Sequence, residues 1–321
     1  MIRNIVKVAG MACALIVMST DVDAQTRTES LRYGDMEHWV TRHIKESAVI
    51  GGQDKTLYEI GPDTVIDGNV AYRNLKGSQW GSSNVMAKVA GVVKTNTTVS
   101  PDTHRGGRCA KLTTHVEQLK VLGLVNINVL AAGSIFLGDM KEPITGTKDG
   151  VKNLNWGIPF KKRPKALGFD YKTSIPSSAT RVKQTGFSPK TTVDGQDYAV
   201  ALLLLQKRTE DAKGNITAKR VGTLVVKYGK STNGWVEGAS YPILYGNIEG
   251  KPGYDAEMMK LRDFDYARNS KGQSVPVIET GWADENETPT HLVLQFSSSH
   301  GGAYVGTPGN TLWVDNVKLI Y

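Results

Sequence analysis

Four tryptophan residues lie in turn-rich stretches and carry the first chemical signal of the sequence: Trp80, Trp156, Trp235 and Trp282. A sugar site needs an aromatic face for the apolar side of a pyranose ring, flanked by amide, carboxylate or guanidinium groups for the hydroxyls. Aromatic residues on loops are often functional, although each of these tryptophans could instead cover the end of a core. We predict a carbohydrate-binding site that contains Trp80, Asn84, Arg105, Glu142, Trp156, Trp235 and Trp282.

Catalytic motifs are weak or missing in this sequence. Retaining glycosidases need two carboxyl groups about 5 Å apart across the sugar, and no Glu-x-Asp-x-Glu run occurs here. The pairs in Asp263-Phe-Asp265 and Asp284-Glu-Asn-Glu287 are more simply interpreted as a solvated strand edge and an acidic loop. The chain also has no Gly-x-Ser-x-Gly elbow, no phosphate-binding glycine motif and no dinucleotide fingerprint. The sequence therefore assigns no catalytic residue.

The first 24 residues have the pattern of a secretory signal peptide. A basic start precedes an apolar run from Val8 to Met18, and the small-residue site Val22-Asp-Ala24 ends the segment. The alternative is a short buried helix. No later segment reaches the ~18 apolar residues of a spanning helix. We expect export to the periplasm, the cell surface or the extracellular space, a mature protein of residues 25–321, and no membrane span.

Cysteine and histidine residues form no metal motif. Without the predicted signal peptide, Cys109 is the only cysteine, which excludes an intramolecular disulfide and a thiolate zinc cluster. The six histidines are scattered and show no His-Glu-x-x-His spacing. Because free cysteine is among the most buried residue types, we expect Cys109 to be a buried structural residue.

The net charge of +8 raises the question of a nucleic-acid partner. No recognised nucleic-acid motif accompanies the charge, and export argues against such a partner. The densest basic cluster, Lys161-Lys-Arg-Pro-Lys165, is interpreted as solvated surface, with attraction to acidic glycans as the alternative. We expect no nucleic-acid partner.

The end of the chain predicts two β-strands, Thr290 to Phe296 and Thr311 to Tyr321. In the first of them, Leu292 and Leu294 alternate with less apolar residues, which is typical of a strand with one buried face. In the second, large apolar groups occupy both sets of alternating positions. Such a strand cannot stay loose, so we expect it to close a sheet with strands from much earlier in the chain.

Most of the chain from Trp80 onward alternates like strands and turns. Tyr198–Leu205 and Arg220–Tyr228 are predicted to form a long hairpin of central strands, and the ambiguous stretch Tyr33–Ile60 is also predicted to form a hairpin. No sustained helical period occurs, so the predicted fold is an all-β sandwich. We expect one domain over residues 25–321, with an N-terminal extension, residues 25–74, packed on it.

The run Val121–Leu137 has one apolar face and one face that carries amides. Amide groups on a central strand are costly unless they are hydrogen-bonded or wet. The face with Asn126, Asn128 and Ser134 is therefore predicted to line a cleft or the concave side of the sandwich.

Several stretches together resemble a known family. The ending Leu312-Trp-Val-Asp-Asn-Val-Lys-Leu-Ile-Tyr321, with the Gly-rich connection before it, resembles the terminal strand of carbohydrate-binding jelly rolls. Further matches are Trp80-Gly-Ser-Ser-Asn84, Gly106–Leu112, Ala131–Gly138 and Gly157–Lys172. As a set they are similar to the putative carbohydrate metabolism domain family. The resemblance implies an exported β jelly roll of sugar-foraging bacteria and brings no agreed catalytic residues.

The same resemblance suggests a structural Ca²⁺ ion near the chain ends, with Asp315 in the final strand as a ligand. Calcium takes about six to eight oxygen ligands. Asp35, Glu37 and backbone carbonyl groups could join Asp315 only if the N-terminal segment pairs beside the last strand. The alternative is a solvent-facing Asp315 paired with a lysine.

We therefore expect an exported, non-catalytic jelly roll whose partner is an oligosaccharide or polysaccharide. One alternative is a glycoside hydrolase or lyase, which rests on fold analogy alone. Another is a structural cell-surface subunit with a long unpaired apolar edge strand. We expect the ligand site at a loop end where Trp80, Trp156 and Trp282 converge, and the alternative is a groove along the amide-bearing strand face.

Overall fold

The computed structural model describes residues 27–75, 77–89, 91–121, 125–146, 149–186, 189–302 and 304–321. The predicted signal peptide, residues 1–24, lies outside these ranges. Nearly all regular structure in the described residues is β-strand. These residues also form a short 3-10 helix, η1 (Ala48–Ile50), and a short α-helix, α1 (Asp149–Lys152). In this described part, the chain forms no helix of the length and apolarity that crossing a bilayer requires.

The final strand of the chain lies in the middle of a six-stranded sheet. The order is β21-β15-β27-β9-β8, and β1 pairs with β27 off this path. The prediction that the chain end closes a sheet with much earlier strands is confirmed. The bounds are β1 (Thr28–Ser30), β8 (Val99–His104), β9 (Gly107–Thr113), β15 (Ala166–Ser174), β21 (Val236–Pro242) and β27 (Thr311–Ile320).

A second sheet has ten strands and contains the predicted long hairpin. Its order is β13-β12-β25-β19-β20-β24-β23, and β5, β14 and β22 pair with it off this path. Strands β19 and β20 pair along twelve residues of each and confirm the hairpin. The bounds are β5 (Trp80–Ser82), β12 (Ser134–Met140), β13 (Leu154–Trp156), β14 (Ile158–Pro159), β19 (Ala199–Glu210), β20 (Ile216–Tyr228), β22 (Leu244–Tyr245), β23 (Asp265–Arg268), β24 (Ser274–Trp282) and β25 (His291–Ser297).

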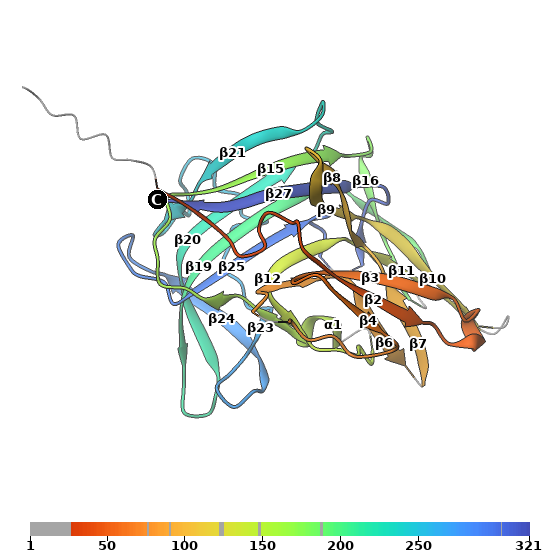
Figure 1. The fold of residues 1–321 in the computed structure, drawn as a ribbon. Helices are drawn as coiled ribbons and strands as arrows, with labels where there is room; N and C mark the ends of the chain where they lie inside the picture. Colours follow the sequence, from red (N-terminus) through yellow and green to blue (C-terminus); the bar gives the residue numbers. More distant parts are fainter. Residues whose placement is uncertain are drawn as a thin grey trace, which may run out of the picture.

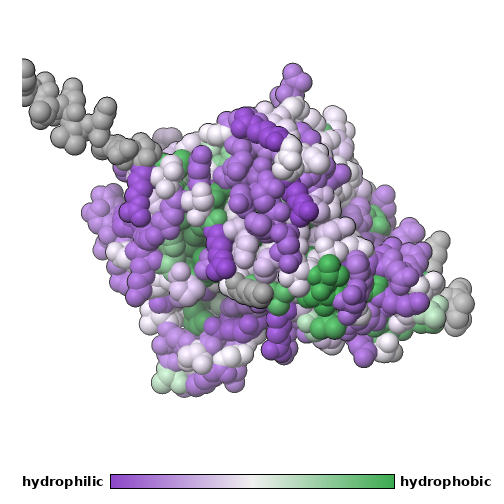
Figure 2. All heavy atoms as spheres, viewed as in Figure 1, coloured by the Kyte–Doolittle hydropathy of each residue, from purple (hydrophilic) through white to green (hydrophobic). Residues whose placement is uncertain are grey.

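The two sheets pack face to face as an all-β sandwich of the jelly-roll type, with strands β21, β15 and β27 lying over β20, β19 and β25 (Figure 1). The main core lies between them and contains Leu167 and Phe169 from one sheet and Leu203, Leu294 and Phe296 from the other. On the face shown in Figure 2, hydrophilic residues predominate and hydrophobic ones gather in small patches. The predicted sandwich is therefore confirmed.

Asn316 interrupts the alternation of β27. Its φ of 52° lies in the left-handed region, and the pairing between β15 and β27 shifts there by one extra residue of β27, which is a β-bulge. The predicted division of this strand into two faces is wrong after Asp315, because the extra residue brings Val317 and Leu319 to the side of Leu312 and Val314. The side chains of β27 in the main core are those of Leu312, Val314, Val317 and Leu319.

Strand β19 is apolar on both faces because both faces are covered. Leu203 and Leu205 point into the main core. Val200, Leu202 and Leu204 point the other way and pack in a second cluster with Trp156. The outer face of the ten-stranded sheet is therefore partly apolar.

The run Val121–Leu137 is not one strand. Strand β11 (Val125–Ala131) pairs with β10 (His115–Val121) and β17 (Thr185–Gly186), whereas β12 belongs to the ten-stranded sheet. The chain turns at Gly133, whose N–H donates to Thr113 O at 3.1 Å. The predicted single strand is therefore wrong, although Leu130, Ala132 and Ser134 of the predicted amide-bearing face do line a large cavity.

Smaller sheets surround the sandwich. The predicted N-terminal hairpin is confirmed by the pairing of β2 and β3, and its residues Trp39 and Ile60 belong to the main core. Cys109 is fully buried, as predicted. The remaining strands are β2 (Trp39–Lys45), β3 (Asp54–Ile60), β4 (Thr64–Asp67), β6 (Val85–Val89), β7 (Val92–Asn96), β16 (Thr180–Lys183), β18 (Thr191–Asp194) and β26 (Val305–Gly306).

Candidate functional site

A cavity of about 1220 Å³, here called the cleft, lies against the outer face of the ten-stranded sheet. Residues of β12, β25 and β19 form its floor. Its walls are formed by residues of β6, β7 and β11, by residues of 257–266 and 299–302, and by Tyr304. Small-molecule sites usually occupy about 300–1,000 Å³. The cleft therefore has room for a ligand of several rings.

The floor combines apolar side chains with an amide. Phe136, Gln295 and Leu202 are register neighbours on adjacent strands and face the cleft. Gly81 lies opposite Phe136, and a Cβ there would be 2.6 Å from the ring Cζ, so only glycine leaves room for the ring. The half-buried amide of Gln295 makes no side-chain hydrogen bond within the described residues, so it can bond a ligand.

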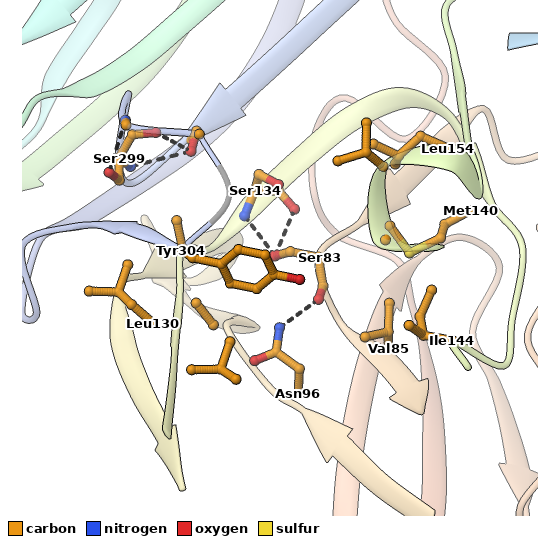
Figure 3. A pocket seen from close by; sticks show the side chains of 18 of the residues that line it. Ser83, Val85, Asn96, Leu130, Ser134, Met140, Ile144, Leu154, Ser299 and Tyr304 are labelled. Atoms are coloured by element: carbon orange, nitrogen blue, oxygen red, sulfur yellow. Dashed lines mark hydrogen bonds between the residues drawn. The ribbon is translucent and has the colours of Figure 1, made fainter. Parts of the chain in front are cut away.

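The cleft has a polar end and an apolar end. Tyr304 projects into the cavity (Figure 3), and burial raises the pKa of its phenol, which therefore stays neutral. Nearby, Ser83 Oγ accepts a hydrogen bond from Ser134 N at 2.8 Å, and Asn96 Nδ2 donates to Ser83 O at 2.8 Å. The apolar end is lined by Val85, Met140, Ile144 and Leu154 (Figure 3).

A basic wall closes the polar end. His300 Nδ1 lies 2.9 Å from Asp197 Oδ1, and its Nε2 lies 3.0 Å from Arg181 Nη1. Because arginine only donates, His300 Nε2 accepts, and the tautomer with the proton on Nδ1 fits the contact with Asp197. Arg181 Nε is buried and has no hydrogen-bond partner among the described residues. This wall therefore places the imidazole of His300 and the guanidinium of Arg181 at the polar end of the cleft.

A second constellation, here called the outer-face cluster, lies on the exposed side of the six-stranded sheet and contains His104, Asp170, Glu237 and Asp315. One ligand atom from each of His104, Asp170 and Glu237 lies within 4.8 Å of the others. His104 Nδ1 lies 2.6 Å from Asp315 Oδ2, and Nε2 lies 3.1 Å from Glu237 Oε1. A cavity of about 320 Å³ opens beside Asp170 and Glu237.

Burial and hydrogen bonding shift the pKa values of His104 and Asp170 in opposite directions. Burial alone would lower the pKa of His104, but hydrogen bonds to Asp315 and Glu237 outweigh it and raise that pKa. Burial would raise the pKa of Asp170, but hydrogen bonds from Gly238 N and the Asn316 amide lower it. Burial is the largest effect at Asp315 and raises its pKa. The strands thus hold several charged groups at close range.

Three of the predicted site residues meet at this cluster. Trp235 stacks on His104 with ring centroids 3.8 Å apart, and Arg105 Nε lies 3.1 Å from Glu237 Oε1. Asp315, the predicted calcium ligand, is buried and bonds His104 and its neighbour Asn316 N. The strand β1 does pair beside β27, as the calcium prediction required.

Trp80 and Asn84 lie in the interior. Trp80 is 1% exposed and its Nε1 donates to Arg32 O at 2.9 Å. The amide of Asn84 is buried; its oxygen accepts from Thr98 N and Val99 N, and its nitrogen donates to Tyr58 O and Val99 O. An amide that is satisfied internally has no capacity left for a sugar hydroxyl.

The side chain of Glu142 is also buried. Its carboxylate accepts from both terminal nitrogens of Arg42, at 3.0 and 2.6 Å, and from the backbone N–H groups of Tyr72 and Met86. Arg42 Nη1 also donates to Glu59 at 3.0 Å. Glu142 therefore joins the N-terminal hairpin to the sandwich.

Trp80, Trp156 and Trp282 do not converge at a loop end. Trp80 packs in the main core and Trp156 in the outer cluster on the other side of the sheet. Trp156 lines the cleft, where Phe136 stacks on it with ring centroids 5.7 Å apart. Trp282 lies half-buried at the end of β24, with the guanidinium of Arg220 5.6 Å from its ring centroid.

Sequence reasoning named Trp156 and Ser134 of the cleft and Arg105 of the smaller cavity, but it missed most of the residues that face the two cavities. Gln295 was detectable, because its position alternates with the buried Leu294 and Phe296. His104 and Glu237 lie 133 positions apart, and no local spacing could predict their contact. Strand order alone places them together.

The chain belongs to the family described as putative carbohydrate metabolism domain, whose model matches residues 54–320. No curated protein matches the chain.

Two solved structures are similar to it, both described as putative glycoside hydrolases. One, from Bacteroides thetaiotaomicron, has 18% identity and a TM-score of 0.43 and covers 84% of this chain and 76% of that chain. The other, from Bacteroides vulgatus, has 14% identity and a TM-score of 0.40 and covers 91% and 94%.

Proposed function

We propose that the protein binds an oligosaccharide, or a segment of a polysaccharide, in the cleft without cleaving it. The observation that carries the proposal is the set of aromatic walls around a free amide on the floor: Phe264, Tyr266, Tyr304 and Gln295 all line the cleft. Membership in a carbohydrate-metabolism family supports a sugar as the ligand.

The side chains match what a sugar presents. Phe264 lines the cleft and is 50% exposed, and the guanidinium of Arg262 lies 4.4 Å from the centroid of its ring. Its apolar face suits the C–H groups of a pyranose. The amide of Gln295 suits the hydroxyls. An apolar end beside a polar end also favours a ligand with both kinds of surface.

Two variants test the cleft. Gln295→Ala removes a hydrogen bond of about 1 kcal/mol, so the affinity for the best glycan should fall roughly fivefold. Phe264→Ala removes a stacking surface worth about 1 kcal/mol and should have an effect of similar size. Affinity is measured by calorimetry, after a panel of neutral and acidic glycans has been screened by tryptophan fluorescence.

Matched controls lie outside the cleft. Gln53→Ala removes an exposed amide on the N-terminal hairpin, and Val65→Ala shortens a side chain that is 59% exposed. Both should bind like the parent. Failure to bind any glycan would refute the proposal, and unchanged affinity in both cleft variants would exclude the cleft as the site. Release of new reducing ends would show that the protein is a hydrolase rather than a binding protein.

A further inference from the structure

We propose that His104, Asp170 and Glu237 bind one divalent transition-metal ion of the zinc class, with Asp315 as the residue that positions the histidine. The ligand atoms would be His104 Nε2 and one carboxylate oxygen each from Asp170 and Glu237. This site is separate from the cleft and does not depend on the proposed sugar binding.

The distances fit a shared ion. Zinc binds imidazole nitrogen at about 2.0–2.1 Å and carboxylate oxygen at about 2.0–2.2 Å, so neighbouring ligand atoms around one ion lie roughly 3–3.5 Å apart. His104 Nε2 and Glu237 Oε1 are 3.1 Å apart. All three candidate ligand atoms lie within 4.8 Å of one another. Small rotations of the carboxylate side chains would therefore bring all three ligand atoms to the spacing that one ion requires.

The other ring nitrogen of His104 is already fixed. Metal-ligating histidines usually donate the second N–H to a carboxylate or carbonyl, which sets the tautomer and aims the free nitrogen at the ion. His104 Nδ1 lies 2.6 Å from Asp315 Oδ2, and the side chains of both residues are about 95% buried or more. Trp235 stacks on the imidazole and limits its rotation.

Hydrogen bonds also fix the second ligand, Asp170. Asp170 Oδ1 accepts from Gly238 N at 2.5 Å, and Oδ2 accepts from Asn316 Nδ2 at 2.8 Å. Each carboxylate oxygen has a second lone pair, so these bonds orient the group without exhausting it. The β-bulge at Asn316 places that amide beside Asp170, which gives the irregular backbone a structural reason.

The balance of charge favours a cation. Asp170, Glu237 and Asp315 surround one imidazole, and the nearby Arg105 has a side chain that is 67% exposed and well solvated. Two of the three carboxylates are buried. A divalent ion would compensate more of this negative charge than a single proton on His104 can.

The donor set selects the class of metal. Calcium prefers six to eight oxygen ligands, whereas imidazole suits zinc and its neighbours. One nitrogen and two oxygens leave further coordination positions, and the adjoining cavity of about 320 Å³ has room for water there. We therefore expect Zn²⁺ to bind more tightly than Ca²⁺.

The test uses the full folded chain after exhaustive chelation. Calorimetric titration with ZnCl₂ should show one strong site per chain, and CaCl₂ should bind at least tenfold more weakly. Co²⁺ should give visible absorption bands that report nitrogen and oxygen ligands. Glu237→Ala removes a ligand whose side chain is 36% exposed and should weaken zinc binding at least tenfold while the melting temperature of the metal-free protein stays unchanged.

Two further variants separate ligation from simple structural support. Asp315→Asn should weaken zinc binding about 10- to 100-fold and alter the Co²⁺ spectrum, as expected for a residue that orients the ligand. His43→Ala removes an exposed histidine that lies 2.7 Å from Asp67 and should leave the strong site intact. Absence of a stoichiometric zinc site, tighter binding of Ca²⁺, or unchanged zinc affinity in Glu237→Ala would each overturn the proposal.

Discussion

Arg42 is buried between two glutamates, Glu59 and Glu142, at the junction of the N-terminal hairpin and the sandwich. Burial raises the pKa of Glu59 to about 8, although the charge of Arg42 opposes this. Glu59 is therefore largely protonated at neutral pH. The guanidinium of Arg42 then balances the single negative charge of Glu142. The Glu142 carboxylate accepts hydrogen bonds from both terminal nitrogens of Arg42.

This raised pKa predicts that stability falls as pH rises. The folded state keeps a proton on Glu59 between about pH 4.5 and 8, whereas the unfolded chain has released it, so the free energy of unfolding decreases across that window. Above pH 8 the full contribution of Glu59 to the free energy of unfolding would be lost. This amounts to a few kcal/mol, at about 1.4 kcal/mol for each unit of pKa shift. Glu59→Gln should remove this part of the pH dependence and be more stable than the parent at pH 9.

Urea unfolding followed by circular dichroism at pH 5, 7 and 9 measures the effect. The difference between variant and parent isolates Glu59 from the other titrating groups. Glu249→Gln, on an exposed loop, serves as the control and should follow the parent at every pH. If Glu59→Gln and the parent lose stability in parallel between pH 5 and 9, the raised pKa is not the cause.

At the scale of the element, local alternation predicted the strands that have one regular face. Leu292, Leu294 and Phe296 alternate in sequence and all lie in the main core. The prediction failed where the backbone departs from regular pleating, at the bulge of Asn316 and at the turn of Gly133. A single residue with left-handed φ reverses every later side chain of a strand. Hydrophobic periodicity does not reveal such a residue.

Gly133 allows the chain to pass from β11 to β12, and this gives a second prediction. A Cβ at this position would overlap the backbone atoms Thr113 N and Thr98 O. Backbone cannot move aside as a flexible side chain can, so Gly133→Ala should destabilise the protein by more than about 3 kcal/mol. Gly150→Ala is the matched control, because nothing lies within 4 Å of its added Cβ. Equal urea midpoints for the two variants would contradict this role of Gly133.

At the scale of the whole molecule, the sequence predicted the class of fold better than the site. Aromatic residues in turn-rich context include both Trp80, which packs in the core, and Trp235, which lies beside the outer-face cluster. Composition cannot separate these two cases, because burial depends on which strands cover each position. The cluster itself draws residues from β8, β15, β21 and β27, whose order in the sheet differs from their order in the chain.

The N-terminal strands complete the core of the sandwich. Met36, Trp39 and Ile60 are at most 3% exposed and belong to the same cluster as Phe169 and Phe296. Burial of such side chains contributes about 1.5–3 kcal/mol each, so the three together contribute roughly 5–9 kcal/mol. This is comparable to the whole stability of an ordinary domain, about 5–15 kcal/mol.

Removal of residues 1–74 should therefore prevent folding, and residues 54–74 of this segment lie within the family match. A chain of residues 75–321 would lose the Arg32 carbonyl that accepts from Trp80 Nε1 and the Arg42 guanidinium that pairs with Glu142. Thermal unfolding by circular dichroism compares this chain with residues 27–321, which keep every described contact and should melt like the parent. A cooperative transition of residues 75–321 near the parent's melting temperature would show that the N-terminal segment is dispensable for folding.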